Sequence, residues 1–416
     1  MPVDEPDADS PVESAAPRPA PPILDLTAEI TELTEQIIAC ESVSGNERRL
    51  ADAVESALLE LGGLWVHRDG DTVIARTDTG ADQRVVLAGH LDTVPLPSDP
   101  ETRGAPGFRG TVPPQWMTAE GTPCGTPPAA GRAKDDVLYG RGATDMKGGV
   151  AVQLKLAADV AARLRTLTAA QSLARDVTWV FYDHEEVEAS KSGLGRVLRT
   201  SPDLLAADFA VLLEPTHGAV EGGCNGTCRL RVTMPGVAAH SGRAWMGRNA
   251  IHATAPILAA LEAYEPRTVD VDGLAYREGL NAVSISGGIA GNVIPDACTV
   301  EINYRFAPDK TEAQAQEHVR QVLRSAGIDE ELTEVTDSSP GARPGLDHPA
   351  AQAFVAAVGG SPKPKYGWTD VARFSALGVP AVNFGPGDPL LAHTDDEHVT
   401  AEALRACYAA MHRWLS

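Results

Sequence analysis

Two stretches of the chain alternate helical patterns with short, continuous apolar runs. Between residues 145 and 213, the helical patterns MKGGVAVQLKLAADVAARL and SGLGRVLR alternate with the apolar runs VTWVFY and FAVLL. After residue 348, the helical patterns PAAQAFVAAV, VARFSALG and ALRACYAAMHRWL accompany the run AVNF. Continuous apolar strands between helices are typical of a parallel sheet that helices cover on both faces. The pattern therefore predicts an α/β fold built on a mostly parallel sheet.

The N-terminal quarter of the chain adds two helices, a hairpin and a strand to this sheet. The helical patterns are ILDLTAEITELTEQIIA and LADAVESALLEL, and Ser44 with Glu47 is expected to form a capping box before the second. WVHRDGDTVIART alternates and turns at Asp69-Gly70, which predicts a hairpin. The apolar strand RVVLAG then ends at His90.

Residues 226–334 follow a different pattern. RLRVTM, AVSISGGI and ACTVEINYRF are longer, alternating strands, and NAIHATAPILAALEAY and EAQAQEHVRQVLRS are amphipathic helices. This pattern predicts a smaller α+β domain that is inserted into the first. The larger domain would then comprise residues 23–225 and residues 335–416.

Two segments have no periodic pattern. Residues 1–22 are rich in proline, alanine and acidic residues and contain no apolar stretch, which predicts a disordered acidic tail and not a signal peptide. Residues 97–135 are dense in proline and glycine and predict a long loop.

The charge and cysteine content limit the partners and the compartment. A net charge of -22, from 35 basic and 57 acidic residues, argues against binding to nucleic acid or to an anionic membrane. The most apolar helical pattern, AVQLKLAADVAARL, is too short and too charged to span a membrane. The six cysteines are scattered along the chain, which indicates that they are small buried hydrophobic side chains in a reducing compartment and not ligands of a zinc knuckle. We therefore expect a cytoplasmic protein.

Side chains of the types that bind metals follow the predicted parallel strands. They are His90 after RVVLAG, Glu185 and Glu186 after VTWVFY, Glu214 after FAVLL, His393 after AVNF, and Asp145 at the start of a helix. Ligands of an open α/β sheet bind beyond the carboxyl ends of its strands, so these side chains are expected to lie together. One such histidine alone is more often structural, and one such carboxylate is more often a helix cap. Their coincidence at equivalent strand ends predicts a metal site.

The donor types indicate which metals would bind and how many. With the adjacent Glu185 and Glu186 counted as one ligand position, the set has two imidazoles, three carboxylates and no thiolate, which suits zinc, cobalt or manganese better than copper or an iron–sulfur cluster. Five side chains are too many for one tetrahedral catalytic ion, which takes three and keeps one position open. Two ions that share one carboxylate would use all five side chains and offset the repulsion between the carboxylates.

The motifs LAGHLDTVP, GRGATDMKGG, HEE and LLEP, with the late His393, resemble the dinuclear zinc family of aminoacylases, deacetylases and carboxypeptidases. The resemblance runs from about residue 30 to the end of the chain. It implies a zinc-exopeptidase-like fold in which the inserted domain is a lid and dimerisation domain. It also implies a homodimer, two Zn²⁺ per subunit with Co²⁺ possible in one site, and a cis peptide bond between Asp145 and Met146.

The resemblance further implies a role for each residue of the site. One zinc would be bound by His90, Asp145 and Glu214, and the other by Asp145, Glu186 and His393. Glu185 would be the general base, and Asp92 would hold the ring of His90 through its free nitrogen.

Four residues outside the ligand set are similar to functional residues of the family. His240, in GVAAHSGR, is similar to a histidine that reaches the other subunit's site and stabilises the oxyanion, although an exposed loop histidine is the simpler interpretation. Asn292 and Arg305 resemble contacts to a substrate carboxylate, with an ordinary strand surface as the alternative. Thr369 matches a threonine that lines the pocket.

The segments YGWTDVARF and NFGPGDPLLAH resemble the branch of the family that acts on a small acidic N-acyl amino acid, N-succinyl-LL-2,6-diaminopimelate. Hydrolysis would give succinate and LL-diaminopimelate, a step of diaminopimelate and lysine biosynthesis. Bulky Trp368 and acidic Asp370 depart from the usual glycine-serine-rich pocket. The alternatives are a related deacylase acting, for example, on acetylornithine, a carboxypeptidase-like hydrolase, and a non-catalytic metal-binding relative. The presence of Glu185 disfavours the last.

Overall fold

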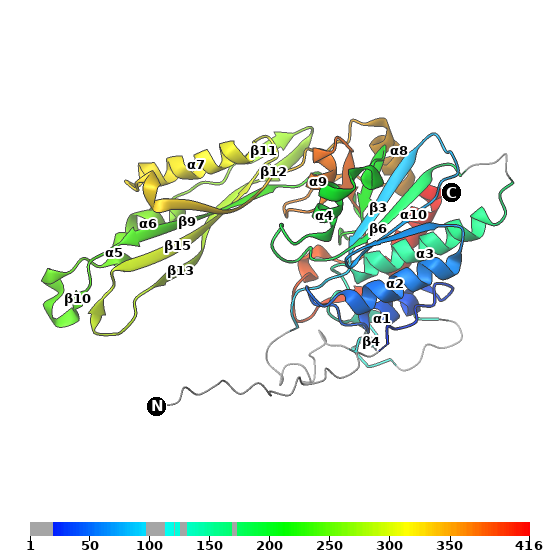
Figure 1. Ribbon diagram of the computed structural model, residues 1–416, viewed down its shortest axis with the longest axis horizontal. Helices are drawn as coiled ribbons and strands as arrows, with labels where there is room; N and C mark the ends of the chain where they lie inside the picture. The colour runs from blue at the N-terminus through cyan, green and yellow to red at the C-terminus, as the bar shows by residue number, and fades with distance from the viewer. Residues whose placement is uncertain (1–19, 97–112, 120, 125–130, 169–172) are drawn as a thin grey trace, which may run out of the picture.

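The computed structural model describes residues 20–96, 113–119, 121–124, 131–168 and 173–416 of the chain. Most of the predicted acidic tail and much of the predicted loop over residues 97–135 lie outside these residues. Figure 1 shows a large sheet with helices on both faces and a narrower sheet that projects away from it. The four residue ranges that we assigned to the tail and the domains stay a prediction.

The large sheet has eight strands, and the four at its centre run parallel. In spatial order the strands are β1 (Trp65–Asp69), β2 (Thr72–Arg76), β6 (Asp176–Tyr182), β3 (Arg84–His90), β7 (Phe209–Leu212), β18 (Ala381–Asn383), β8 (Glu221–Gly222) and β17 (Lys363–Pro364). Strands β6, β3, β7 and β18 pair in parallel, whereas the predicted hairpin β1–β2 pairs antiparallel at one edge. The predicted α/β fold with a mostly parallel sheet is confirmed.

Helices cover both faces of this sheet because successive residues of a strand point to opposite sides. Leu87 and Trp179 face one layer of helices, and their neighbours Val86 and Val180 face the other. The first layer contains α1 (Ile30–Ile38), α2 (Arg48–Leu61), α3 (Lys147–Leu164), α8 (Pro349–Val358) and α10 (Ala401–Leu415). The second contains α4 (Gly193–Thr200) and α9 (Val371–Ala376). Burial on both faces leaves the ends of the strands as the accessible part of the sheet.

A small antiparallel sheet joins the segment before Asp145 to the C-terminal part of the chain. Its strands, in spatial order, are β19 (His398–Thr400), β5 (Val137–Tyr139) and β4 (Gln115–Met117). Strand β4 lies in the segment that we predicted to be a loop.

The narrow sheet is antiparallel and is covered on one face. Its strands, in spatial order, are β13 (Gly279–Gly287), β15 (Ala297–Phe306), β9 (Gly226–Pro235) and β16 (Thr333–Ser339). Side chains such as Val300 and Ile302 of β15 pack against Val319 of a helix. The helices here are α5 (Ala250–Ala253), α6 (Ala255–Glu262) and α7 (Glu312–Ser325). Two short pairs complete this part: β11 (Thr268–Val271) with β12 (Leu274–Arg277), and β10 (Ala239–His240) with β14 (Val293–Ile294).

Two details of the predicted elements are wrong. The predicted capping box of Ser44 and Glu47 does not form; α2 begins after Glu47, and the hydroxyl of Ser44 donates a hydrogen bond to Asp92 Oδ2 at 2.7 Å. The helix predicted over residues 249–264 is divided at Thr254 into α5 and α6. Pro256 follows this break, and it has no N–H with which to continue the helical hydrogen bonds.

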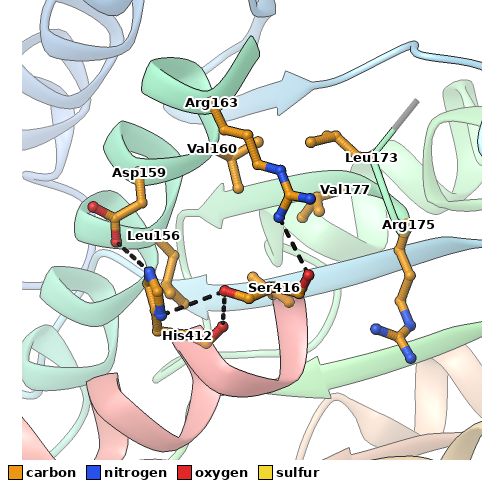
Figure 2. A pocket seen from close by; sticks show the side chains of 10 residues that line it. Leu156, Asp159, Val160, Arg163, Leu173, Arg175, Val177, His412 and Ser416 are labelled. Atoms are coloured by element: carbon orange, nitrogen blue, oxygen red, sulfur yellow. Dashed lines mark hydrogen bonds and ion pairs between the residues drawn. The ribbon is translucent and has the colours of Figure 1, made fainter. Parts of the chain in front are cut away.

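None of the helices in the described part of the chain has the length and apolar character needed to cross a bilayer. A small hollow lies between the C-terminal half of α3, strand β6 and the end of α10, and Figure 2 shows the side chains that line it. Its charged groups are already paired, His412 with Asp159 and Arg163 with the carbonyl of Ser416. A volume of about 50 Å³ holds a few water molecules but no amino-acid substrate. This hollow is therefore too small to be the functional site.

Candidate metal centre

Three neighbouring parallel strands deliver metal-binding side chains to one edge of the large sheet. Strand β3 ends at His90, β6 leads into Glu185 and Glu186, and β7 leads into Glu214. Asp145 precedes α3, and its peptide bond to Met146 is cis, as the resemblance implied.

All five predicted ligands lie in one cluster. The ligand atoms of His90, Asp145 and Glu214 lie within 4.8 Å of one another, and so do those of Asp145, Glu186 and His393. A third group with the same spacing, His90 with Glu185 and Glu186, is part of the same cluster.

Asp145 lies between the two groups of ligands. Its Oδ1 is 3.2 Å from Nε2 of His90, and its Oδ2 is 3.3 Å from Nε2 of His393. Nε2 of His393 is also 3.0 Å from Oε1 of Glu186. Each oxygen of Asp145 thus faces a different group, which is the arrangement that a bridging carboxylate requires.

The charges of the cluster perturb one another strongly. Hydrogen bonds to Asp145 and Glu186 raise the pKa of His393 to about 10. Burial lowers the pKa of His90, but the hydrogen bond to Asp145 and the nearby carboxylates outweigh burial and hold this pKa well above its usual range. Burial and the charge of Asp145 raise the pKa of Glu214 to about 8. The raised pKa values show that the cluster carries an excess of negative charge from its carboxylates. Bound cations could neutralise this charge in place of protons.

The donor set fits divalent cations for a second reason. Oε1 of Glu214 is buried and has no hydrogen-bond partner among the described residues. An unpaired buried carboxylate oxygen is costly unless it binds a proton or a metal. Imidazole nitrogens and carboxylate oxygens without thiolates suit zinc, cobalt or manganese.

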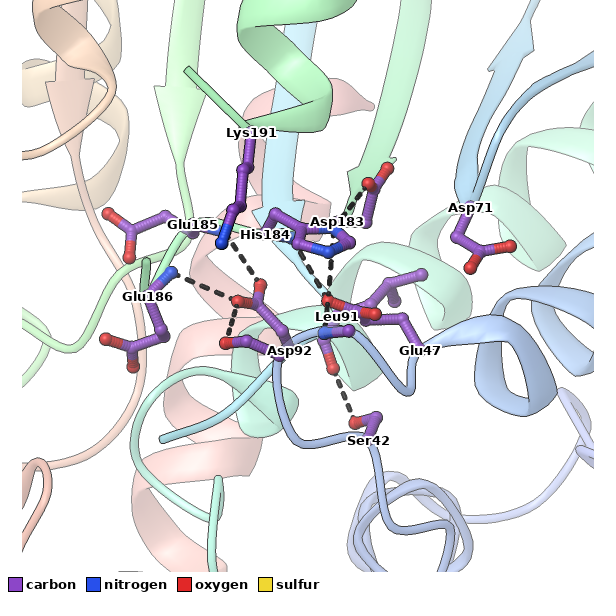
Figure 3. A network of polar contacts seen from close by, with 12 residues as sticks. Ser42, Glu47, Asp71, Leu91, Asp92, Asp183, His184, Glu185, Glu186 and Lys191 are labelled. Carbon is purple, nitrogen blue, oxygen red and sulfur yellow. Dashed lines mark hydrogen bonds and ion pairs between the residues drawn. The ribbon is translucent and has the colours of Figure 1, made fainter. Parts of the chain in front are cut away.

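Asp92 contacts His90 and also holds the turn that carries the two glutamates, and Figure 3 shows Asp92 beside this turn. Nδ1 of His90 lies 2.9 Å from the main-chain oxygen of Asp92 and 3.6 Å from Oδ1 of its carboxylate. The same carboxylate accepts hydrogen bonds from the main-chain N–H groups of Glu185 and Glu186, each at 3.0 Å, and from the hydroxyl of Ser44. Asp92 therefore contributes more to the position of the glutamates than the sequence indicated.

Two residues that the sequence did not assign to the site also hold this turn (Figure 3). His184 has a positive φ of 58°, and its Nδ1 lies 2.7 Å from Oδ2 of Asp183. Oε1 of the buried Glu47 accepts hydrogen bonds from the N–H groups of Gly45 and His184, at 2.9 and 3.2 Å. The run of ionisable residues after β6 was the one sequence signal for these contacts.

The cluster does not include His240 or Asn292. Both are exposed and lie beside each other, because the N–H of Ser241 donates to the carbonyl of Asn292 at 2.9 Å and His240 pairs with Val293. In Figure 1, strand β10, which ends at His240, lies at the far end of the narrow sheet, away from β3 and β6.

The last two predicted contacts lie in different parts of the structure. Thr369 is buried before α9, and its hydroxyl donates to Oδ1 of Asn383, at the end of β18, at 3.0 Å. Arg305 lies in β15, where burial and then the charge of Arg229 lower the pKa of its guanidinium. Within the described ranges, no carboxylate lies within ion-pair distance of Arg305.

Comparisons with known proteins agree with this geometry. The chain is 46% identical over 394 residues to a putative succinyl-diaminopimelate desuccinylase of Mycobacterium tuberculosis, covering 94% of this chain and 99% of the relative. It is 41% identical over 398 residues to a succinyl-diaminopimelate desuccinylase of Corynebacterium glutamicum, covering 95% and 98%.

Solved structures share the fold. An M20 family metallo-carboxypeptidase, Sso-CP2 from Sulfolobus solfataricus, matches with a TM-score of 0.71 at 17% identity, over 93% of this chain and 98% of that one. A tripeptidase from Staphylococcus aureus matches with a TM-score of 0.68 at 18% identity, over 94% and 98%. Residues 86–416 match the description "Peptidase family M20/M25/M40". The chain therefore belongs to the peptidase family M20/M25/M40.

Proposed function

We propose that the protein hydrolyses the amide bond of N-succinyl-LL-2,6-diaminopimelate to succinate and LL-diaminopimelate, a step of diaminopimelate and lysine biosynthesis, in the cytoplasm. The observation that carries this proposal is the 46% identity to a putative desuccinylase over 94% of this chain and 99% of the relative. The cluster of carboxylate and histidine ligands supports the chemistry, because amide hydrolysis by this family is metal-dependent.

We assign two Zn²⁺ to each subunit, with Co²⁺ possible in one site. His90, Asp145 and Glu214 would hold one ion, and Asp145, Glu186 and His393 the other. The shared Asp145 and the unpaired Oε1 of Glu214 support this assignment. When bound, the cations would polarise the substrate carbonyl and lower the pKa of a water molecule.

Glu185 is assigned the proton transfers. Burial and then the charges of Glu214, Glu186 and Asp370 outweigh the effect of His90 and raise the pKa of Glu185 well above its usual range, which makes its carboxylate a stronger base than an exposed one. Its main-chain N–H is held by Asp92, which limits the movement of the side chain. Glu185 would take a proton from the attacking water and deliver it to the leaving amine.

The remaining residues are assigned to the substrate. His240 would reach the site of the other subunit in a homodimer and donate a hydrogen bond to the oxygen on which negative charge develops. Asn292 and Arg305 would bind a substrate carboxylate, and Arg305 is suited to this because it has no acidic partner within the described ranges. Thr369 would line the pocket.

A substrate comparison tests this function. Purified, zinc-loaded protein is assayed with N-succinyl-LL-2,6-diaminopimelate, N-acetylornithine and a glutamyl dipeptide. We expect kcat/KM for the succinyl substrate to exceed the others by roughly 10²-fold, because the acetyl group has no carboxylate and the glutamyl dipeptide carries its carboxylates at other positions relative to the amide bond. A preference for the acetyl substrate or the dipeptide would contradict the proposed substrate. It would still agree with hydrolysis of an amide bond, the chemistry of the family.

A further inference from the structure

We propose that Glu397 and Arg141 are positioning residues of the metal centre. Together they tie the loop that carries Asp145 to the segment that carries His393, and so fix the site formed by Asp145, Glu186 and His393. This inference rests on the proposed two-ion centre and extends it to two residues that bind neither ion.

Glu397 holds the main chain of the bridging ligand. Its side chain is 1% exposed, and its Oε1 accepts hydrogen bonds from the N–H of Asp145 at 3.0 Å and of Thr144 at 3.1 Å. A charged acceptor makes such bonds stronger than a neutral one does. The position of Asp145 therefore depends directly on this carboxylate.

Arg141 extends the connection to the histidine. Its Nη1 lies 2.9 Å from Oε2 of Glu397 and also donates to the carbonyl of Thr394, the residue after His393, at 2.9 Å. The hydroxyl of Thr144 adds a bond to the carbonyl of His398 at 2.6 Å. One oxygen of Glu397 thus binds the main chain of the loop that carries Asp145. The other binds Arg141, whose guanidinium also contacts the segment that carries His393.

The two ligands tied in this way are the ones that no strand of the large sheet presents. His90 ends β3, and Glu186 and Glu214 follow β6 and β7, so the paired strands fix their positions. Asp145 precedes a helix, and His393 lies in a connecting segment with a φ of 64°. Other contacts must therefore fix the positions of Asp145 and His393.

Stability alone does not account for a buried pair of this kind. The guanidinium and carboxylate are 4% and 1% exposed, and removing two charges from water costs about as much as their attraction returns. An apolar pair of similar volume often stabilises a fold as well. A charged pair can in addition hold main-chain groups in place, and here these belong to the loops of two ligands.

The test measures metal affinity in Glu397→Gln, which keeps the size of the side chain but removes its charge. Zinc is titrated into metal-free protein in competition with a chromogenic chelator, which gives two dissociation constants. We expect one of the two constants, that of the site formed by Asp145, Glu186 and His393, to rise about 10- to 100-fold above its wild-type value, the usual effect of losing a partner outside the ligand set. The constant for the other ion should change less, because His90 and Glu214 stay fixed by the sheet.

Asp176→Asn is the matched control. Asp176 is also buried, and its carboxylate accepts hydrogen bonds from the main-chain N–H groups of Thr79 and Ala81. Its Oδ2 lies 3.8 Å from Nη2 of Arg84. It sits at the first residue of β6, at the end of the strand opposite the ligands. We expect this variant to lose thermal stability while both zinc constants stay as in the wild type.

Arg141→Lys is a second, milder variant. Lysine keeps the positive charge but lacks the planar fork that serves Glu397 and Thr394 together, so we expect a smaller loss of zinc affinity. The positioning role would be overturned if the zinc dissociation constants did not change in Glu397→Gln and Arg141→Lys. It would also be overturned if Asp176→Asn changed these constants as much as Glu397→Gln does. If wild-type protein binds a single ion, the two-ion centre fails, and the positioning role then requires that Glu397→Gln weaken that ion at least about tenfold.

Discussion

The metal cluster and the far end of the narrow sheet differ in how many of their proposed contacts form within one chain. At the cluster, five ligands and Glu185 come from one chain and already contact one another. At the far end, His240 is exposed beside large exposed apolar side chains, Trp245, Met246 and Ile289, which are 80, 65 and 85% exposed. We proposed that the first region binds cations and that the second meets another subunit. We therefore expect perturbations of the two regions to separate metal binding from subunit assembly.

Metal removal is expected to have the largest effect. Dialysis against a chelator should abolish hydrolysis, because the carboxylates and histidines of the cluster cannot activate water without cations. Subunit assembly, measured by sedimentation, should not change. Added zinc should restore the activity. Full activity in protein shown by elemental analysis to contain no metal would contradict the account of the cluster.

Changes to the two adjacent glutamates should divide catalysis from metal binding. Glu185→Gln should keep both ions and reduce kcat by about 10²-fold or more, because it removes the general base. Glu186→Gln should lower metal affinity instead, because it removes a ligand. Kinetics and metal analysis on both variants check this. Equal loss of metal in both would mean that our assignment of the pair is wrong.

A charge at the far end of the narrow sheet should affect assembly and leave the metals in place. Trp245→Glu should raise the dissociation constant of the proposed dimer by about tenfold or more, because a tryptophan that becomes buried in an interface contributes strongly to binding. Sedimentation over a range of protein concentrations measures this constant. Trp65→Glu is the control, since Trp65 is 48% exposed on β1 of the large sheet. Equal effects of the two variants would argue against an interface at Trp245.

The smallest effect concerns the substrate carboxylate. Arg305→Lys should raise KM by roughly tenfold with little change in kcat, because lysine cannot form the two parallel hydrogen bonds that arginine forms with a carboxylate. Arg229→Lys is the matched control from the neighbouring strand, where Arg229 lies 3.9 Å from Asp337. A lower kcat at unchanged KM in Arg305→Lys would remove Arg305 from substrate binding.

Three of the proposed ligands could be predicted from the sequence because an apolar strand ends at or shortly before each of them. His90 ends β3, Glu186 and Glu214 follow β6 and β7, and the edge that these strands share brings the three side chains together. The sheet itself could be predicted for the same reason, since its strands are continuous apolar runs.

The contacts that hold the ligands could not be predicted. Glu397 accepts hydrogen bonds from main-chain groups 252 and 253 residues earlier, and no local pattern indicates such a contact. Ser44 was assigned to a helix cap from local spacing, but its hydroxyl bonds to Asp92, 48 residues later. Local spacing cannot distinguish a cap from a partner that the fold brings close.

The most direct test of the central claim, that one subunit's metal cluster is completed by the other's His240, mixes two inactive variants. Glu185→Ala and His240→Ala are combined under conditions in which subunits exchange. In a mixed dimer, one site carries both changes and the other carries neither. With random pairing, about a quarter of the wild-type activity should return. If His240 acts within its own subunit, every site keeps one change, and no recovery despite proven exchange would contradict the claim.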